Sequence, residues 1–416
     1  MLFLYRLIIN LIFLLSPFIL LVRLIKKKED YIRFKEKFCF FSKKRIKGKL
    51  VWIHGASVGE ILSVIPLVEK LEKNKEIKQV LITSNTLSSS KVLSQLKLKK
   101  TIHQFFPIDT NFNSKRFLNH WNPSTVIFVD SEIWPNMLLN IKKKSISLIL
   151  LNARITKKSF KRWIKFPKLS KTLFKIFDIC LTSDKDSKRY LKILGAKNIK
   201  YIGNLKFSQR EKSQYNINNN LRKNFSTKLI WCASSTHDGE EKFCALVHKK
   251  LKVKYKNLLT IIIPRHVNRI NKITQEMKKL NLNTHIHNSK NKMDKNTDIY
   301  LVNSYGETKS FFKTCKIVFL GGSLIKHGGQ NPLEPAQYGC KIIHGPNIWN
   351  FKEVYNLLNR FKISNKISGI NQMTKIISNL FKNKFNSMKI KLTINNLGHK
   401  ILQNTFKEIN YFITKK

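Results

Sequence analysis

The stretch that decides the fold is GGSLIKHGGQNPLEPAQYG, residues 321–339. It follows the apolar run Ile317–Leu320, which is typical of a buried parallel strand. A strand that leads into glycines and then into a helix predicts backbone N–H groups that bind a phosphate. Pro332 is expected at the first helical position and Glu334 in the first turn, where a carboxylate caps the helix or holds a ribose. The alternative is a tight turn without a ligand.

The same strand–loop–helix pattern extends on both sides of this stretch. In the first half, apolar runs occur at 50–53, 80–83, 126–129, 147–151 and 179–181. In the second half, they occur at 229–233, 259–263, 299–302, 317–320 and 341–343. Alternation of this kind predicts an α/β fold with two parallel sheets, each covered by helices on both faces. Ligands of such sheets bind at the carboxyl ends of the strands, so we expect a cleft there.

The domain boundaries follow from where the pattern stops and restarts. Residues 207–226 are polar, rich in Asn, Lys and Ser, and without a clear period. The sequence therefore predicts an N-terminal anchor over 1–28, a first domain over 29–206, a linker over 207–226 and a second domain with terminal helices over 227–416.

The N-terminal segment Leu2–Ile25 is strongly apolar, and its uncharged core, Leu7–Val22, is slightly short for a membrane span. Many basic residues follow it, and only Arg6 and the amino terminus precede it. The positive-inside rule then predicts an inner-membrane protein with its domains in the cytoplasm. The anchor is either a single pass or a monotopic helix, because Pro17 interrupts the segment.

Composition favours an anionic partner. The 416 residues carry a formal net charge of +55, but the lysines are spread along the whole chain. We interpret this as compositional drift together with attraction to an anionic membrane surface, and we do not expect nucleic-acid binding. The six cysteines form no CxxC pair, which is typical of free thiols and not of structural zinc.

Candidate catalytic carboxylates lie at strand ends in the first half. Glu60 opens a helix directly after HGASVG (54–59), where the helix dipole favours an ionised carboxylate that acts as a general base. Asp130, in the run 130–132, follows another strand, and the segment 152–154 is expected either to bind an anion or to pair with that run. Lys206 is a candidate for meeting a negatively charged substrate. The alternative is that Glu60 does no more than cap its helix.

In the second half, three more loops are expected at the same sheet edge as residues 321–334. They are the acid- and hydroxyl-rich run 234–241, Pro264-Arg265-His266, and Tyr305-Gly306-Glu307. An Arg at a strand end is well placed for a phosphate. The chain has no Walker A loop and no HExxH, so we expect no catalytic metal and no cofactor.

Taken together, these motifs resemble the bacterial 3-deoxy-D-manno-octulosonic acid (Kdo) transferases. The resemblance rests on stretches that span nearly the whole chain in order: HGASVGE (54–60), DSEIWPN (130–136), NLKF (204–207), STHDGEE (235–241), IIIPRH (261–266) and GGSLIKHGGQNPLEPA (321–336). It implies a GT-B glycosyltransferase, with CMP-Kdo as donor and lipid IVA as acceptor. Two positions depart from the family pattern: Asp130 replaces a usual Glu, and Gln330 replaces a frequent His.

The resemblance also implies roles for individual residues. Glu60 matches the proton acceptor, and Asp130 and Lys206 match positions that stabilise the transition state. The matches to CMP-binding segments are Pro264, Arg265, Tyr305, Gly306, Glu307, Asn331, Pro332, Leu333 and Glu334. The implied reaction inverts the anomeric carbon through an oxocarbenium-like transition state. The alternatives are a GT-B nucleotide-sugar epimerase, or a basic membrane- or nucleic-acid-binding protein without catalysis.

Overall fold

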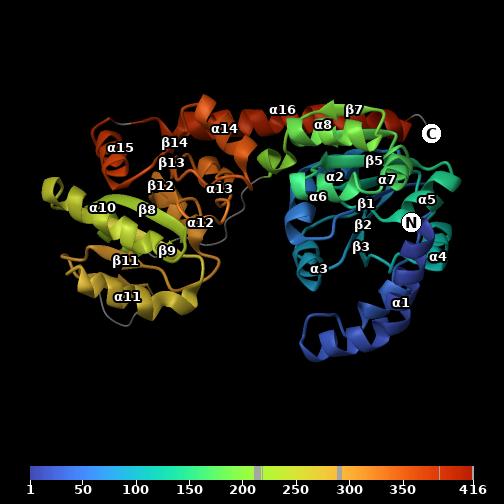
Figure 1. The fold of residues 1–416 in the computed structure, drawn as a ribbon, viewed down its shortest axis with the longest axis horizontal. Helices are drawn as coiled ribbons and strands as arrows, with labels where there is room; N and C mark the ends of the chain where they lie inside the picture. Colours follow the sequence, from blue (N-terminus) through green and yellow to red (C-terminus); the bar gives the residue numbers. More distant parts are fainter. Residues whose placement is uncertain (210–216, 218, 288–292, 384, 415–416) are drawn as a thin grey trace. The chain divides into compact units, whose positions relative to one another are not determined.

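The computed structural model describes residues 1–209, 217, 219–287, 293–383 and 385–414. They form two compact units (Figure 1): unit 1 is Met1–Arg210 with Leu397–Lys416, and unit 2 is Glu211–Asn396. Each unit is built on a seven-stranded sheet whose paired neighbours all run parallel. The prediction of two parallel-sheet α/β domains is therefore confirmed.

The sheet of unit 1 has the strand order β3-β2-β1-β4-β5-β6-β7. This is the Rossmann order with one further strand at the edge. Its strands are β1 (Lys49–His54), β2 (Ile77–Ser84), β3 (Thr101–Phe105), β4 (Thr125–Val129), β5 (Ser147–Ala153), β6 (Ile179–Thr182) and β7 (Ile199–Tyr201). The inner strands are buried and form a core with the aromatic side chains of the covering helices, such as Phe117 and Trp121.

The helices of unit 1 cover the sheet; most of them connect its strands, while α1 and η1 precede β1 and η2 follows β7. They are α1 (Leu2–Ile25), η1 (Arg33–Phe38), α2 (Val58–Lys73), α3 (Leu87–Ser94), α4 (Asn111–Trp121), α5 (Pro135–Lys143), α6 (Lys157–Trp163), α7 (Pro167–Phe174), α8 (Lys185–Leu194) and η2 (Leu205–Ser208). The first of them, α1, is long and apolar enough to cross a membrane.

Unit 2 repeats the plan with the strand order β10-β11-β9-β8-β12-β13-β14. Its strands are β8 (Leu229–Thr236), β9 (Leu258–Pro264), β10 (Thr284–Ile286), β11 (Ile299–Leu301), β12 (Ile317–Leu320), β13 (Lys341–His344) and β14 (Ser364–Lys366). The helices are α9 (Asn219–Ser226), α10 (Glu240–Lys254), η3 (Val267–Arg269), α11 (Ile270–Lys279), α12 (Thr308–Thr314), α13 (Leu333–Gln337), α14 (Lys352–Arg360), α15 (Ile370–Lys382) and α16 (Ser387–Thr414).

The boundaries differ from the predicted ones at two places. The predicted linker 207–226 contains the end of η2 and the helix α9, and its residues 210–216 and 218 lie outside the described residues. The end of α16, from Leu397 on, belongs to unit 1 and not to the second domain. It packs there because Gly398 lets the helix approach the backbone of Phe207, and because Glu408 pairs with Lys200 at 2.8 Å.

All six cysteines are buried and free. The expectation of free thiols is therefore confirmed.

Candidate active site

The strand order changes direction between β1 and β4 in unit 1. In open α/β sheets, ligands bind outside the carboxyl ends of the strands at such a switch point. Here the turn that leads from β1 into α2 carries Glu60, and the residue that follows β4 is Asp130. The fold therefore brings two carboxylates that are seventy positions apart in the chain to the same sheet edge.

Glu60 lies in the first turn of α2, which Ser57 caps. Its carboxylate accepts hydrogen bonds from the backbone N–H of Ala56 at 2.7 Å and from the hydroxyl of Ser57 at 2.8 Å. Burial raises the pKa of Glu60, the charges of Asp130 and Glu132 raise it further, and the bond from Ser57 opposes them. The carboxylate thus caps its helix and is also a stronger base than an ordinary glutamate.

Asp130 sits in a left-handed backbone conformation, with φ of 59°. Its Oδ1 accepts a 2.6 Å hydrogen bond from the side-chain amide of Asn152. Burial raises the pKa of Asp130, while the nearby charges of Lys206 and Arg154 counteract this. The predicted pairing of segment 152–154 with the carboxylates is therefore confirmed.

Asn152 connects this carboxylate to the turn that carries Lys206. Its side-chain oxygen accepts the backbone N–H of Leu205 at 3.0 Å. Asn204 caps the short helix η2 by accepting the N–H of Lys206 at 2.9 Å. Among the charges that act on Asp130, the ammonium of Lys206 lowers its pKa the most. The structure thus brings together Glu60, Asp130 and Lys206, the three predicted catalytic residues.

Glu132 completes the acidic side of this cluster. Its Oε2 accepts a 2.8 Å hydrogen bond from the indole N–H of Trp134 and lies 3.3 Å from Nε2 of the buried His54. His54 is held on its other side by the hydroxyl of Thr83, 2.9 Å away. The histidine at the end of β1 therefore orients a carboxylate, a role that the sequence did not indicate.

The glycine loop of unit 2 differs from the expected phosphate cradle. The backbone N–H groups of Gly322, Ser323 and Leu324 donate to the carboxylate of the buried Glu240, at 2.6 to 3.1 Å. Gly321 is required here, because a Cβ would lie 2.4 Å from the carbonyl oxygen of Ser235. A side chain of the same unit therefore already accepts the hydrogen bonds of these three amides, so a phosphate site in this stretch does not include them.

Three histidines gather instead at the switch point of unit 2, between β8 and β12. The ring of the buried His237 lies 4.2 Å from that of His327 and 6.0 Å from that of His266. Burial, together with the positive potential of the two other histidines and of Arg265, lowers the pKa of His237 to about 4. His237 is therefore uncharged near neutral pH, and the imidazole N–H groups beside the charge of Arg265 suit an anion. Sequence reasoning missed it, although each histidine stands in a quoted motif.

The other predicted nucleotide-binding residues surround the same sheet edge. Pro264 ends β9, and the exposed Arg265 follows it, with its backbone N–H bound to Thr236. Tyr305 is exposed and Gly306 has φ of 88°.

Glu307 lies 2.6 Å from Nε2 of His287 and accepts the hydroxyl of Ser304, so its carboxylate already has partners. Pro332 is the N-cap of α13, one position earlier than expected. Asn331 accepts the N–H of Leu333 at 3.1 Å, and Glu334 lies in the first turn. Within the described residues, no three His, Cys, Asp or Glu side chains are placed to hold a metal ion together.

Comparison with known proteins identifies the family. The family model of 3-deoxy-D-manno-octulosonic-acid transferases (kdotransferase) matches residues 32–209. The 3-deoxy-D-manno-octulosonic acid transferase of Rickettsia bellii is 35% identical over 342 residues, which are 81% of this chain and 81% of that protein. This chain belongs to the Kdo transferase family. The corresponding transferase of Haemophilus influenzae is 29% identical over 365 residues, or 85% of this chain and 83% of that one.

As a Kdo transferase, the chain is a glycosyltransferase of lipopolysaccharide biosynthesis. Solved structures agree on the fold, which is that of GT-B enzymes. The UDP-GlcNAc 2-epimerase of Neisseria meningitidis covers 88% of this chain and all of its own, with a TM-score of 0.58 and 13% identity. Identity this low shows a shared fold alone, so the epimerase alternative gains no support from it.

Proposed function

We propose that this Kdo transferase moves Kdo from CMP-Kdo to a sugar hydroxyl of lipid IVA, with inversion at the anomeric carbon and Glu60 as the general base. The observation that carries the proposal is the grouping of Glu60, Asp130 and Lys206 at the switch point of unit 1. A general base works best when its pKa approaches the working pH. Burial raises the pKa of Glu60, and the two neighbouring carboxylates raise it as well.

In the proposed reaction, Glu60 accepts the proton of the acceptor hydroxyl as its oxygen attacks the anomeric carbon. The bond from that carbon to the phosphate oxygen of the donor breaks, and CMP leaves with the electron pair. Attack and departure occur on opposite faces of the sugar, so the configuration inverts. The reacting carbon becomes oxocarbenium-like, as in other glycosyl transfers.

Asp130 and Lys206 are proposed to stabilise this transition state. Their charges act on each other, and Asn152 links the carboxylate of Asp130 to the backbone of Leu205, the residue before Lys206. A fixed carboxylate favours the positive charge that develops on the sugar, and a fixed ammonium favours the negative charge on the leaving group. Because Asp130 is one methylene shorter than the usual Glu, its hydrogen bond from Asn152 is the contact that sets its position.

Unit 2 is proposed to bind the CMP part of the donor. Arg265 and the histidine cluster offer positive potential for the phosphate, and the loops that hold Tyr305 to Glu307 and Asn331 to Glu334 flank the same sheet edge. Guanidinium and imidazole groups neutralise a leaving phosphate without a metal ion. We therefore propose that no cofactor takes part.

We further propose that the protein works at the cytoplasmic face of the inner membrane. The apolar helix α1 and the basic residues that follow it support this location. An anionic bilayer would also carry the lipid acceptor. We propose no nucleic-acid partner.

The test is incubation of the protein with freshly generated CMP-Kdo and lipid IVA, followed by mass spectrometry of the lipid. The proposal predicts a mass gain of one or more Kdo units. An unchanged lipid, with CMP still bound to the protein, would contradict lipid IVA as the acceptor. An unchanged lipid without CMP binding would contradict the assigned donor as well.

A further inference from the structure

One face of α1 is covered by unit 1 along the entire helix. The covered or half-covered positions repeat every three or four residues, which marks a single stripe: Leu2, Tyr5, Arg6, Ile9, Phe13, Ser16, Leu20, Arg23 and Leu24. All other positions are exposed. One stripe of the helix is therefore covered by other parts of unit 1, and the opposite face is bare.

The amino-terminal end of α1 is tied to the starts of α4 and α5. The hydroxyl of Tyr5 donates to Asp109 at 2.7 Å, and Arg6 donates to the side chain of Asn136 at 3.0 Å. Asp109 is fully buried and also accepts the backbone N–H groups of Asn136 and Met137. Tyr5 is thus one member of a buried polar network that would lose a partner if the helix left.

The carboxyl-terminal end of α1 is tied to the segment that follows it, which contains η1. Arg23 and Lys37 both donate to the buried Glu29, at 2.6 and 2.7 Å. In mid-helix, the ring of Phe13 meets that of Phe38 edge to face, with centroids 5.6 Å apart.

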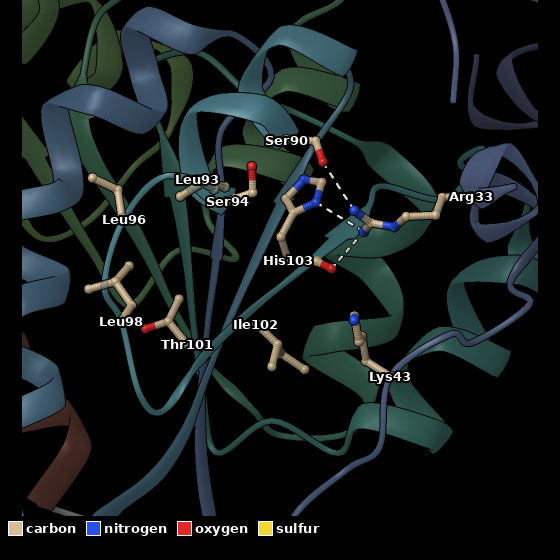
Figure 2. A pocket seen from close by; sticks show the side chains of 10 residues that line it. All are labelled: Arg33, Lys43, Ser90, Leu93, Ser94, Leu96, Leu98, Thr101, Ile102 and His103. Carbon is tan, nitrogen blue, oxygen red and sulfur yellow. Dashed lines mark hydrogen bonds between the residues drawn. The ribbon is translucent and has the colours of Figure 1, made fainter. Parts of the chain in front are cut away.

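The segment after α1 is itself pinned to α3 and β3 (Figure 2). Arg33 donates to the hydroxyl of Ser90 at 3.0 Å and to the carbonyl oxygen of His103 at 2.7 Å. Glu36 accepts the backbone N–H of Phe105 at 2.7 Å. These contacts, beside a cavity of 260 Å³, hold the carboxyl-terminal end of α1 on unit 1.

Two tethered ends are incompatible with a membrane span. The 24 residues of α1 extend about 36 Å at 1.5 Å per residue, and a span would place its ends on opposite sides of about 30 Å of hydrocarbon. Both ends contact the same globular unit, which remains on one side. From this geometry we propose that α1 lies in the membrane plane, within one leaflet, and stays docked on unit 1.

Lipid is the occupant that fits the uncovered face. The exposed positions of α1 are apolar except Asn10, and Phe3, Leu14 and Phe18 are each more than 70% exposed. An apolar surface of this extent is not left to water. The exposed residues Lys26–Lys28 follow directly, where anionic lipid headgroups would meet them. This inference rests on the proposed membrane location and adds its orientation: both ends of α1 stay on the cytoplasmic side.

The test is photocrosslinking of the full-length protein in inner-membrane vesicles. Phe13→p-benzoylphenylalanine places the probe on the docked face, and Leu15→p-benzoylphenylalanine is the matched control on the exposed face. We expect the first to crosslink to the peptide that contains Phe38, and the second to form lipid adducts only. We also expect protease to digest an amino-terminal epitope tag in inverted vesicles but not in intact spheroplasts.

Lipid adducts from both positions, together with digestion of the tag in spheroplasts, would overturn the inference in favour of a spanning helix. A second variant tests the exposed face independently of the probes. Phe18→Glu should leave the fold in detergent unchanged and abolish binding to phosphatidylethanolamine–phosphatidylglycerol vesicles, and unchanged binding would overturn the role of this face. Each result is independent of Kdo transfer, which is assayed with detergent-solubilised substrates.

Discussion

In unit 1, the side-chain amide of Asn152 donates a 2.6 Å hydrogen bond to the carboxylate of Asp130. The oxygen of the same amide accepts the backbone N–H of Leu205, next to Lys206. One side chain therefore positions two residues that we propose to act in the transition state. Asn152 itself adopts φ of 52°, a conformation in which Asn and Gly are favoured.

This relationship predicts that Asn152→Gly removes the link without straining the backbone. We expect kcat to fall on the order of 100-fold, because small misplacements of catalytic groups are that costly. Binding of CMP to unit 2, measured by calorimetry, should stay unchanged. A variant that keeps the normal kcat would show that the link has no role in positioning.

The raised pKa of Glu60 predicts how activity depends on pH. A general base acts in its deprotonated form, so the acid limb of kcat/KM should lie above the ordinary range for a glutamate. Asp130→Asn removes a neighbouring negative charge and suits φ of 59°. The pKa of Glu60 should then fall, and the acid limb should move to lower pH while turnover also decreases.

The control for this pH profile is Glu76→Gln. Glu76 is a half-exposed carboxylate that pairs with Lys49 at the amino end of β1, at the opposite sheet edge from Glu60. Its removal should leave the acid limb in place. An equal shift in both variants would mean that net charge, and not Asp130, sets the pKa of the base.

The buried carboxylate of Glu240 predicts a loss of stability. It accepts three N–H groups from the glycine loop and one from His237. Glu240→Gln places an amide donor against these N–H groups, so the free energy of unfolding of unit 2 should fall by about 1.5–3 kcal/mol. Urea unfolding measures this. Asp238→Asn, at an exposed neighbouring position, should change little, and similar losses in both variants would contradict the assigned role of Glu240.

The histidine cluster predicts a spectroscopic signature of donor binding. The pKa of His237 is about 4 in the free protein, because burial and positive neighbours disfavour its protonated form. A bound phosphate supplies negative charge, so CMP should raise this pKa and binding should take up protons. The affinity for CMP should therefore increase as the pH falls below the pKa of His237 in the complex, and it should level off near pH 4, the pKa in the free protein.

Imidazole NMR titration with and without CMP measures this shift. His248 is the internal control, since it is also buried but is held by Thr260 and Asp298 within unit 2. Its pKa should not respond to CMP. A His237 pKa that CMP leaves unchanged would place the phosphate elsewhere.

Removal of metal ions should not affect the reaction. In our proposal, Arg265 and the histidine cluster neutralise the leaving phosphate. Extensive dialysis against EDTA should leave the rate of Kdo transfer unchanged. A loss of activity that Mg²⁺ restores would contradict a metal-free mechanism.

The sequence predicted the inner strands of both sheets, because these are continuous apolar runs buried on both faces. It missed β3, β7, β10 and β14, which are the four edge strands. Edge strands are partly exposed and short, so polar residues interrupt their apolar pattern. All four strands were missed for the same reason: the apolar pattern of an edge strand is too weak to recognise in the sequence. The prediction of the fold class did not depend on these strands.

The candidate site also contains residues that the sequence predicted and contacts that it did not. The sequence found Glu60 and Asp130, because each carboxylate directly follows a recognisable strand end. It could not show that Glu240 fills the glycine loop, since that contact joins two segments about eighty residues apart. The return of Leu397–Lys416 to unit 1 escaped prediction for the same reason, because long-range packing decides it.

The central claim is that Glu60 is the base of Kdo transfer. The most direct measurement compares Glu60→Gln with the unaltered protein in a transfer assay with CMP-Kdo and lipid IVA, alongside calorimetric binding of CMP. We predict that kcat falls about 10²- to 10⁴-fold while CMP affinity is retained. A Glu60→Gln variant that transfers Kdo at a near-normal rate would contradict the mechanism.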